Sequence, residues 1–365
     1  MLKKCSYNNR NSIAFLIDTP TQLFNSIEYI LGHNLYGVAD AYIQVKFSNA
    51  DELIRRVTKK KIFKNIYLLK PDKNGKLKHL GIINALFFPR FYIKIVHNID
   101  VYSKHYQKIF IAFATKTFDF LIASSGCKNI VGFDDGIGSY LGDPFSDNYK
   151  KRYIYFRKMT GHSYFVNKVY LNNPERYRGI SERKALPIYK KLDSVGKNLI
   201  YEVFNYKDSD LYRNYNVVYL NQPITHIPDY YLKEKEIVGI LGRRLKEKII
   251  IRFHPNEKNK KLYPGFHTDN ENNMWELLCK EQINSNFLLI GYFSTAQFLP
   301  KFIADTEPFI IFTFKLYTGI KDNICKNYCD LVEAVKNSYE NSGKIFIPET
   351  IEEYCHDIEE VCSKI

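Results

Sequence analysis

Val131-Gly132-Phe133-Asp134-Asp135-Gly136-Ile137-Gly138-Ser139-Tyr140 is the stretch of this 365-residue chain that decides its fold. An apolar run at residues 129–133 leads directly into two adjacent carboxylates and a glycine turn. The pattern predicts a strand, a sharp turn and a short helix. Because ligands of open α/β sheets bind at the carboxyl ends of strands, the acid pair is a candidate site.

Asp134 and Asp135 are expected to have different roles. Neighbouring strand residues point to opposite faces of a sheet, so the two carboxylates cannot both face one substrate while the strand geometry lasts. One is then the reacting acid, and the other supports it. Taken alone, the two acids and Gly136 are equally compatible with a solvated Asp-Gly turn, so the rest of the chain has to decide.

The chain before the acid pair alternates between strand and helix patterns. The apolar run Ile13–Ile17 predicts a strand buried on both faces. Thr19 can then cap a helix whose first residue is Pro20. Further strands are expected at 41–47, 62–69 and 108–113, a turn at 71–75, and helices at 20–31, 50–60, 79–88 and 115–123. Such alternation predicts a parallel sheet with covered faces.

The second half repeats this alternation after a segment of different character. Residues 143–191 are polar, aromatic and basic, and we expect an irregular crossing between two domains there. Strands are then expected at 216–220, 248–253, 287–290 and 309–312, and helices at 230–245, 273–282, 296–304, 323–335 and 351–362. We therefore predict two Rossmann-like α/β domains, residues 1–190 and 191–365, whose strand-end motifs face a common cleft.

Composition restricts the class of protein. The hydrophobic and charged shares, 45% and 25%, are those of a globular chain. An odd number of cysteines, seven, without close pairs argues for a reducing compartment. No secretory signal is visible, and no stretch reaches the roughly 18 apolar residues that span a bilayer. We expect a cytoplasmic protein.

The net charge of +14 indicates three candidate partners: nucleic acid, the anionic inner leaflet of a membrane and an anionic substrate. Because the basic residues are scattered and no base-reading module is recognisable, we expect no nucleic-acid partner. Peripheral contact with the anionic inner face of a membrane fits the charge better. Tyrosines among basic residues in the crossing segment are typical of single-strand binding, but we favour an irregular interdomain region, which is also a candidate homodimer interface.

Two short motifs follow predicted strands in the second half. His254 comes directly after the apolar run at 249–253, and Pro255 restricts it to extended geometry. It can donate a proton or bind a phosphate, and a structural turn is the alternative. Ser294 and Thr295 stand before a helix, where hydroxyls and N–H groups bind phosphate, although capping alone explains them too. Gln222 is another polar residue at a strand end.

The order of these motifs resembles that of bacterial sialyltransferases: an acidic pair with glycine, then His-Pro, then Ser-Ser/Thr. The matching residues here are Asp134-Asp135-Gly136, His254-Pro255 and Ser294-Thr295. With the N-terminal Thr19-Pro20-x-Gln22-Leu23 element, the chain looks most like glycosyltransferase family 52, the lipooligosaccharide and capsule sialyltransferases. The bacterial polysialyltransferases come second. The resemblance spans residues 13–308, but each motif is only two or three residues long.

The resemblance implies a two-domain GT-B fold that binds CMP-sialic acid in the C-terminal domain, with no metal or other cofactor. Asp135 matches the general base, and His254 matches the histidine that acts on the CMP phosphate as acid or electrostatic stabiliser. Ser294 and Thr295 match the pair that hydrogen-bonds this phosphate. The remaining candidates are Gln222 and Pro255 for donor binding, and Asp134, Gly136, Thr19 and Gln22 in support of the base.

The function that the resemblance implies is inverting transfer of sialic acid from CMP-sialic acid to a terminal sugar, galactose first, of a surface glycan or glycolipid. Asp208-Ser209-Asp210 has the spacing of a metal-binding Asp-x-Asp motif, but it lies in a polar stretch before a strand, so we expect no metal there. The alternatives are another GT-B transferase, such as a polysialyltransferase or an enzyme with a different nucleotide sugar, and a non-catalytic binder of anionic polymers.

Overall fold

The computed structural model describes residues 12–47, 49–69, 93–94, 96–101, 104–113, 115–142, 144–145, 165–189, 192–225 and 227–365. The chain divides into two compact units, Met1–Asn205 and Tyr206–Ile365. Within the described residues, a seven-stranded sheet forms in the first unit and a six-stranded sheet in the second. All strand pairs are parallel, which confirms the predicted pair of Rossmann-like domains.

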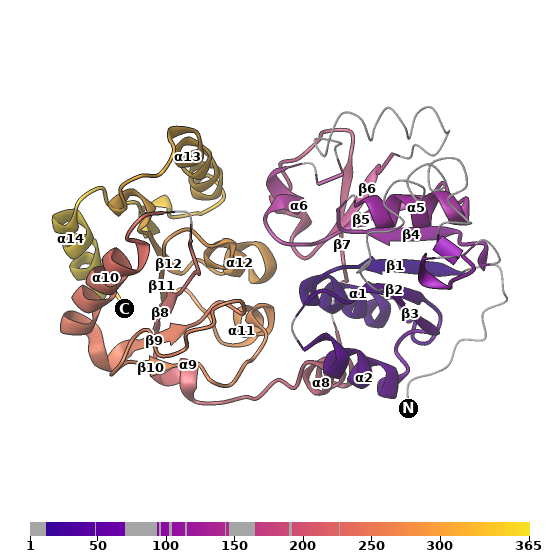
Figure 1. Ribbon diagram of the computed structural model, residues 1–365, viewed down its shortest axis with the longest axis horizontal. Coiled ribbons are helices and arrows are strands. Elements are labelled where there is room, and N and C mark those ends of the chain that lie inside the picture. The colour runs from indigo at the N-terminus through magenta and orange to yellow at the C-terminus, as the bar shows by residue number, and fades with distance from the viewer. Residues whose placement is uncertain are drawn as a thin grey trace. The chain divides into compact units, whose positions relative to one another are not determined.

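The sheet of the first unit has the strand order β3-β2-β1-β4-β5-β6-β7. Its strands are β1 (Ile13–Ile17), β2 (Asp40–Gln44), β3 (Asn65–Leu69), β4 (Lys108–Ile111), β5 (Ile130–Phe133), β6 (Lys168–Leu171) and β7 (Lys184–Pro187). The chain moves outward from β1 to β3 and then resumes at β4 on the other side of β1 (Figure 1). The switch point, where ligands of such sheets bind, therefore lies between β1 and β4.

The helices of the first unit begin largely where the sequence predicted. Within the described residues they are α1 (Pro20–Gly32), α2 (Ala50–Lys60), α5 (Lys116–Ser125), α6 (Gly138–Leu141) and α8 (Ser194–Phe204), with the 3-10 helix η2 (Pro174–Arg176). Of these, α8 was not predicted. Thr19 Oγ1 accepts the Gln22 N–H at 3.2 Å, and Pro20 is the first residue of α1, so the predicted cap is confirmed. The turn expected at 71–75 and the helix expected at 79–88 lie outside the described residues.

Within 143–191, where we expected an irregular crossing, residues 165–189 form regular structure. They contain β6 and β7, which extend the sheet beyond β5. The sequence did not reveal β6 because its burial is partial: Val169 and Leu171 are buried, whereas Lys168 is exposed, so the strand is not a continuous apolar run. Tyr170 packs edge-on against Tyr29 at 4.9 Å, so it stabilises the unit. The tyrosines at 149, 153, 155 and 164 lie outside the described residues.

The first unit ends after Asn205 instead of after residue 190, the boundary that we predicted. The helix that follows residue 190, α8, packs against α1 and α2, and Figure 1 shows it beside α2. Phe204 of α8 meets Phe24 of α1 edge-on, with ring centroids 5.5 Å apart. Burial of this apolar face joins α8 to the first unit.

The sheet of the second unit has the order β10-β9-β8-β11-β12-β13, with its switch point between β8 and β11. Its strands are β8 (Val217–Leu220), β9 (Ile249–Arg252), β10 (His267–Thr268), β11 (Leu288–Gly291), β12 (Phe309–Phe312) and β13 (Ile345–Phe346). The four longer strands lie where the apolar runs predicted them. The two-residue strands β10 and β13 were not predicted, because two residues carry no periodicity.

The second unit contains the helices α9 (Leu211–Asn214), α10 (Tyr230–Leu245), α11 (Trp275–Glu281), α12 (Thr295–Ala304), α13 (Asp322–Lys336) and α14 (Ile351–Cys362), and the 3-10 helices η3 (Lys246–Lys248), η4 (Phe314–Leu316) and η5 (Ser342–Lys344). Ser294 caps α12 as predicted: its Oγ accepts the Ala296 N–H at 3.3 Å, and the Gln297 side chain accepts the Ser294 N–H at 3.0 Å. This reciprocal capping box defines the start of α12. Among the described helices, none has both the length and the apolar content that crossing a bilayer requires.

Aromatic rings connect the central strands of the first unit. Phe15 of β1 stacks on Phe110 of β4 with ring centroids 4.4 Å apart, and Phe133 of β5 meets Phe15 edge-on at 5.9 Å. Stacked and edge-on pairs are the favourable geometries for such rings. The three strands are therefore held in one register, which positions the residues that follow them.

Gly291, the last residue of β11, leaves no room for a side chain. A Cβ there would lie 2.9 Å from the backbone carbonyl oxygen of Leu220 in β8. We predict that Gly291→Ala lowers the free energy of unfolding by about 2 kcal/mol, because a backbone atom cannot rotate away as a side chain can. Urea unfolding followed by circular dichroism measures the change.

Gly239→Ala in the interior of α10 is the matched control in the same unit. The nearest atom to a Cβ at this position is Arg243 Nη1 at 3.8 Å, so alanine fits. This change is expected to raise the free energy of unfolding by about 1 kcal/mol, because glycine destabilises helix interiors. A Gly291→Ala protein as stable as the wild type would contradict the close approach of β8 and β11.

Candidate active site

The acid pair lies directly after β5, at the carboxyl edge of the first sheet. Leu16 of β1 pairs with Ile111 of β4, which in turn pairs with Gly132 of β5. Thr19 lies three residues after Leu16, and Asp135 lies three residues after Gly132. The two residues therefore lie at the same distance beyond the carboxyl edge of the sheet. Their side chains meet, with Thr19 Oγ1 donating to Asp135 Oδ1 at 3.2 Å.

The N-terminus of α1 orients the Asp135 carboxylate. Gln22 Nε2 donates to Asp135 Oδ1 at 3.0 Å, which adds a second donor to the Thr19 hydroxyl. Gln22 is fully buried, and its Oε1 accepts the Asp18 N–H at 2.6 Å, so its amide has a defined orientation. Asp135 itself is half-buried. A partly exposed carboxylate held in one direction is suited to accepting a proton from a bound hydroxyl.

Asp134 lies in the protein interior with no exposed surface. Its Oδ1 accepts the Gly136 N–H at 2.8 Å, and its Oδ2 accepts the Tyr140 hydroxyl at 2.6 Å. Oδ2 also accepts the backbone N–H and the Nδ2 of Asn172, at 3.1 and 3.0 Å. Four uncharged donors thus satisfy a buried carboxylate. The two acids therefore have the separate environments that the strand geometry predicted.

The turn after the acid pair depends on glycine. Gly136 has a φ of 96°, in a region that side chains rarely adopt. This conformation directs its N–H to Asp134 and allows the chain to fold back, so that Ser139 Oγ accepts the Asp135 N–H at 3.0 Å. The backbone of Asp135 is therefore hydrogen-bonded to the start of the helix that follows it.

The second set of motifs lies at the carboxyl edge of the other sheet. Leu220 of β8 pairs with Arg252 of β9 and with Gly291 of β11, so these three strands end level. The residues two positions further along the three strands are Gln222, His254 and Phe293. The structure thus brings the loops of Gln222, His254 and Ser294 next to one another on neighbouring strands.

Gln222 connects the loop after β8 to the start of α12. Its Oε1 accepts the Phe293 N–H at 3.1 Å, directly before the capping residue Ser294. Thr295, the first helical residue, is exposed, and Ser294 is half-buried. Helix N-termini bind anions through their N–H groups and the helix dipole. Because the N–H groups of Ser294 and Ala296 already donate within the capping box, this end of α12 offers a phosphate the helix dipole and the hydroxyls of Ser294 and Thr295.

His254 has a defined tautomer in this loop. Its Nδ1 accepts the Asn256 N–H at 3.1 Å, so the neutral ring carries its hydrogen on Nε2. Burial lowers the pKa of His254 below its ordinary value, and the positive charge of Lys260 lowers it further, whereas Glu257 opposes the shift. A neutral imidazole with Nε2–H can donate a hydrogen bond to a phosphate oxygen. Pro255, next in the chain, is exposed.

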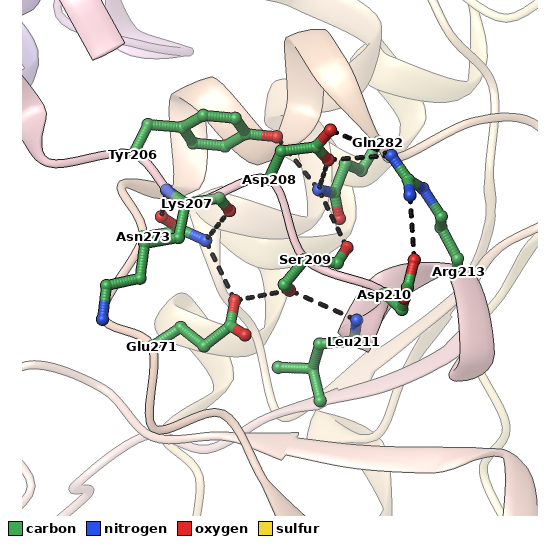
Figure 2. Close-up of polar contacts among 10 residues, drawn as sticks. All are labelled: Tyr206, Lys207, Asp208, Ser209, Asp210, Leu211, Arg213, Glu271, Asn273 and Gln282. Atoms are coloured by element: carbon green, nitrogen blue, oxygen red, sulfur yellow. Dashed lines mark hydrogen bonds and ion pairs between the residues drawn. The ribbon is translucent and has the colours of Figure 1, made fainter. Parts of the chain in front are cut away.

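The Asp-x-Asp motif is engaged in ion pairs (Figure 2). Arg213 Nη2 contacts both Asp208 oxygens at 2.9 and 3.0 Å, and its Nη1 contacts Asp210 at 2.8 Å. Ser209 donates to Glu271 at 2.7 Å. One guanidinium thus forms ion pairs with both carboxylates. Across the described part of the chain, no group of three or more His, Cys, Asp or Glu residues is arranged to hold a metal ion.

Three residues around Asp134 were not predicted as part of the site. Asn25 and Asn172 share hydrogen bonds with Asp134 and with each other, and Tyr140 donates to its carboxylate. Asn172 directly follows β6, so the criterion that found the other candidates, a polar residue after a strand, would have identified it if β6 had been recognised. Asn25 and Gln22 are close on one helix, but nothing in the sequence relates Asn25 to Asp134.

A hollow of about 300 Å³ lies at the amino edge of the first sheet, where β1 and β4 begin. It contains none of the predicted site residues. Its lining consists of Ile13, Tyr29, Leu35, Val38, Gln107, Lys108 and Asn129. Since ligands of open α/β sheets bind at the carboxyl edge, we assign the candidate site by its chemistry and not by this hollow.

Solved structures share this architecture at low sequence identity. The glycotransferase of kitacinnamycin is 10% identical and has a TM-score of 0.52, with 97% of this chain and 91% of that chain covered. The GT-B domain of a sialyltransferase from Photobacterium damselae is 14% identical at a TM-score of 0.52, with 92% and 99% covered. The present chain has the GT-B fold.

The fold does not by itself define the reaction. A UDP-GlcNAc 2-epimerase from Methanocaldococcus jannaschii is 11% identical to this chain, with a TM-score of 0.50 and with 95% of this chain and 92% of that chain covered. No protein-family model and no curated protein sequence matches the chain. Identities of this size establish the GT-B fold alone.

The position of Lys260 yields a test of the electrostatics around His254. Because the charge of Lys260 lowers the pKa of His254, Lys260→Ala is expected to raise this pKa toward the ordinary histidine value. An NMR titration of the imidazole signals measures the shift. Lys258→Ala, an exposed lysine on the same loop, is the control and is expected to leave the titration unchanged. If the His254 titration were unchanged in Lys260→Ala, the charge of Lys260 would not be a cause of the lowered pKa of His254.

Proposed function

We propose that the protein is an inverting sialyltransferase. It transfers sialic acid from CMP-sialic acid to a terminal sugar, galactose in the first instance, of a surface glycan such as lipooligosaccharide or capsule. The observation that supports this most is the contact of Gln22 and Thr19 with Asp135, since Gln22 and Asp135 are 113 residues apart in sequence. Two of the motifs that resemble family 52 thus meet at one carboxylate.

Asp135 is the base of the proposed reaction. It takes the proton of the acceptor hydroxyl as the hydroxyl oxygen forms a bond to the anomeric carbon of the donor. Thr19 and Gln22 hold the carboxylate in place during this step through Oδ1. Positioned proton acceptors of this kind contribute about a hundredfold to ten-thousandfold to rate.

The C-terminal unit stabilises the leaving group. As the bond between the anomeric carbon and the phosphate oxygen breaks, the electron pair stays with CMP, so negative charge grows on the phosphate. His254 Nε2–H and the N-terminus of α12, with Ser294 and Thr295, are suited to binding this charge. Gln222 keeps the start of α12 next to the loop after β8. A single displacement converts a β-linked donor into an α-linked product.

The solved structures are compatible with this proposal without deciding it. One protein with the GT-B fold carries the name sialyltransferase, and another is named an epimerase of UDP-GlcNAc. The residues favour transfer because a positioned carboxylate and a separate phosphate seat are what displacement at an anomeric carbon requires. We further propose that the reaction needs no metal and that the net charge of +14 attracts the anionic donor, the anionic glycolipid acceptor and a membrane surface.

The first test of this proposal is CMP release from CMP-sialic acid, with and without lactose, in the presence of EDTA. We expect release that lactose stimulates and that EDTA leaves unchanged. Release that depends on added Mg²⁺ or Mn²⁺ would contradict metal independence. If the protein used only a different nucleotide sugar, the assignment of CMP-sialic acid as the donor would be wrong. Without any nucleotide release, salt-dependent retention on heparin would favour a binder of anionic polymers.

Substitutions in the two units test the assigned roles. Asp135→Asn is expected to lower kcat about a thousandfold, because the amide cannot accept the proton. His254→Ala is expected to lower kcat about a hundredfold through the loss of the donor to phosphate. Asp210→Asn is the control and should retain wild-type activity, because Asp210 is exposed and paired with Arg213. Full activity of folded Asp135→Asn would contradict the proposed base.

A further inference from the structure

The peptide group between Asp134 and Asp135 is held from both sides. Its carbonyl oxygen, on Asp134, accepts Asn25 Nδ2 at 2.8 Å, and its N–H, on Asp135, donates to Ser139 Oγ at 3.0 Å. Because a peptide group is planar, two hydrogen bonds on its opposite ends define its orientation. The direction in which the Asp135 side chain leaves the backbone depends on this orientation.

Asn172 determines which way the Asn25 amide faces. Asn172 Nδ2 donates to Asn25 Oδ1 at 3.0 Å, so that the nitrogen of Asn25 is left to face the Asp134 carbonyl oxygen. If the Asn25 amide were reversed, its oxygen would face that carbonyl oxygen and no hydrogen bond would form. Asn25 is buried, so water cannot easily replace the lost bond.

Asn172 also holds the Asp134 side chain. It supplies two of the four donors to this fully buried carboxylate, through its backbone N–H and through Nδ2. One residue at the end of β6 is thus hydrogen-bonded to the side chain that follows β5 and to a side chain of α1. Asn172 is thus linked to the Asp134–Asp135 peptide group indirectly, through the Asp134 side chain and through Asn25, whose Nδ2 donates to the Asp134 carbonyl oxygen.

We propose that Asn172 is a positioning residue for the reaction: through Asn25 and the Asp134 carboxylate it sets the Asp134–Asp135 peptide group, and thereby the direction of the Asp135 carboxylate. The proposal rests on the function proposed above, in which Asp135 is the base. Asn172 acts on Asp135 through other residues. Its loss changes the geometry of proton transfer and leaves the donor site in the other unit intact.

The test compares Asn172→Ala and Asn172→Ser with Asn65→Ala. Asn65 lies at the start of β3, and its Nδ2 donates to Oδ1 of buried Asp40 at 2.8 Å. This control therefore also removes an asparagine hydrogen bond to a buried aspartate, but far from the end of β6 in the sequence. For each protein, kcat is calculated from the concentration of folded enzyme, which is determined by circular dichroism. Hydrogen exchange of a peptide covering 134–141 is measured for all variants.

We expect kcat of the Asn172 variants to fall about a hundredfold, as for other small displacements of reacting groups, with KM for CMP-sialic acid changed by less than about twofold. Exchange in 134–141 should become faster in these variants only. Asn65→Ala should match the wild type in kcat. A wild-type kcat in folded Asn172→Ala would overturn the proposal. If both Asn172 variants were unfolded while Asn65→Ala folded, Asn172 would have a structural role and the proposal would also be wrong.

Failure of the proposed function leads to a different result. A wild-type protein that does not use CMP-sialic acid would contradict the function and leave the coupling of Asn172 to the acid pair to be judged by hydrogen exchange. Faster exchange in 134–141 for the Asn172 variants alone would then support the coupling. Unchanged exchange would overturn it.

Discussion

The candidate site depends on the register of parallel strands. β1, β4 and β5 pair so that Thr19 and Asp135 leave the sheet at the same level, and β8, β9 and β11 end level in the same way. A shift of one residue would turn every side chain of a strand to the opposite face. The stacked and edge-on rings of β1, β4 and β5 oppose such a shift in the first unit.

Within that register, the two units present complementary chemistry. The first unit has two adjacent carboxylates, one buried and satisfied by uncharged donors and one half-buried and held by the start of α1. The second has a neutral histidine and a capped helix N-terminus, which favour negative charge on a ligand. In the proposed sialyl transfer, the carboxylate of the first unit accepts the proton and the second unit binds the leaving phosphate.

The fold was predictable where short stretches of sequence carry a clear pattern. Continuous apolar runs revealed the strands buried on both faces, such as β1 and β12, and capping residues located the starts of α1 and α12. The short strands β6, β7, β10 and β13 were missed, since partial burial or a length of two residues leaves too little pattern. The domain boundary was placed too early because α8 belongs to the first unit through packing alone.

By itself, the sequence determined what depends on neighbours a few residues apart: the strand ends, the caps formed by Thr19 and Ser294, and the glycine turn after the acid pair. Only the tertiary structure decided that Gln22 and Thr19 hold Asp135 and that Asn172 joins Asn25 to Asp134. These partners are separated by 38 to 147 residues. Their meeting follows from the order and register of strands, which arise from long-range packing and leave no local pattern.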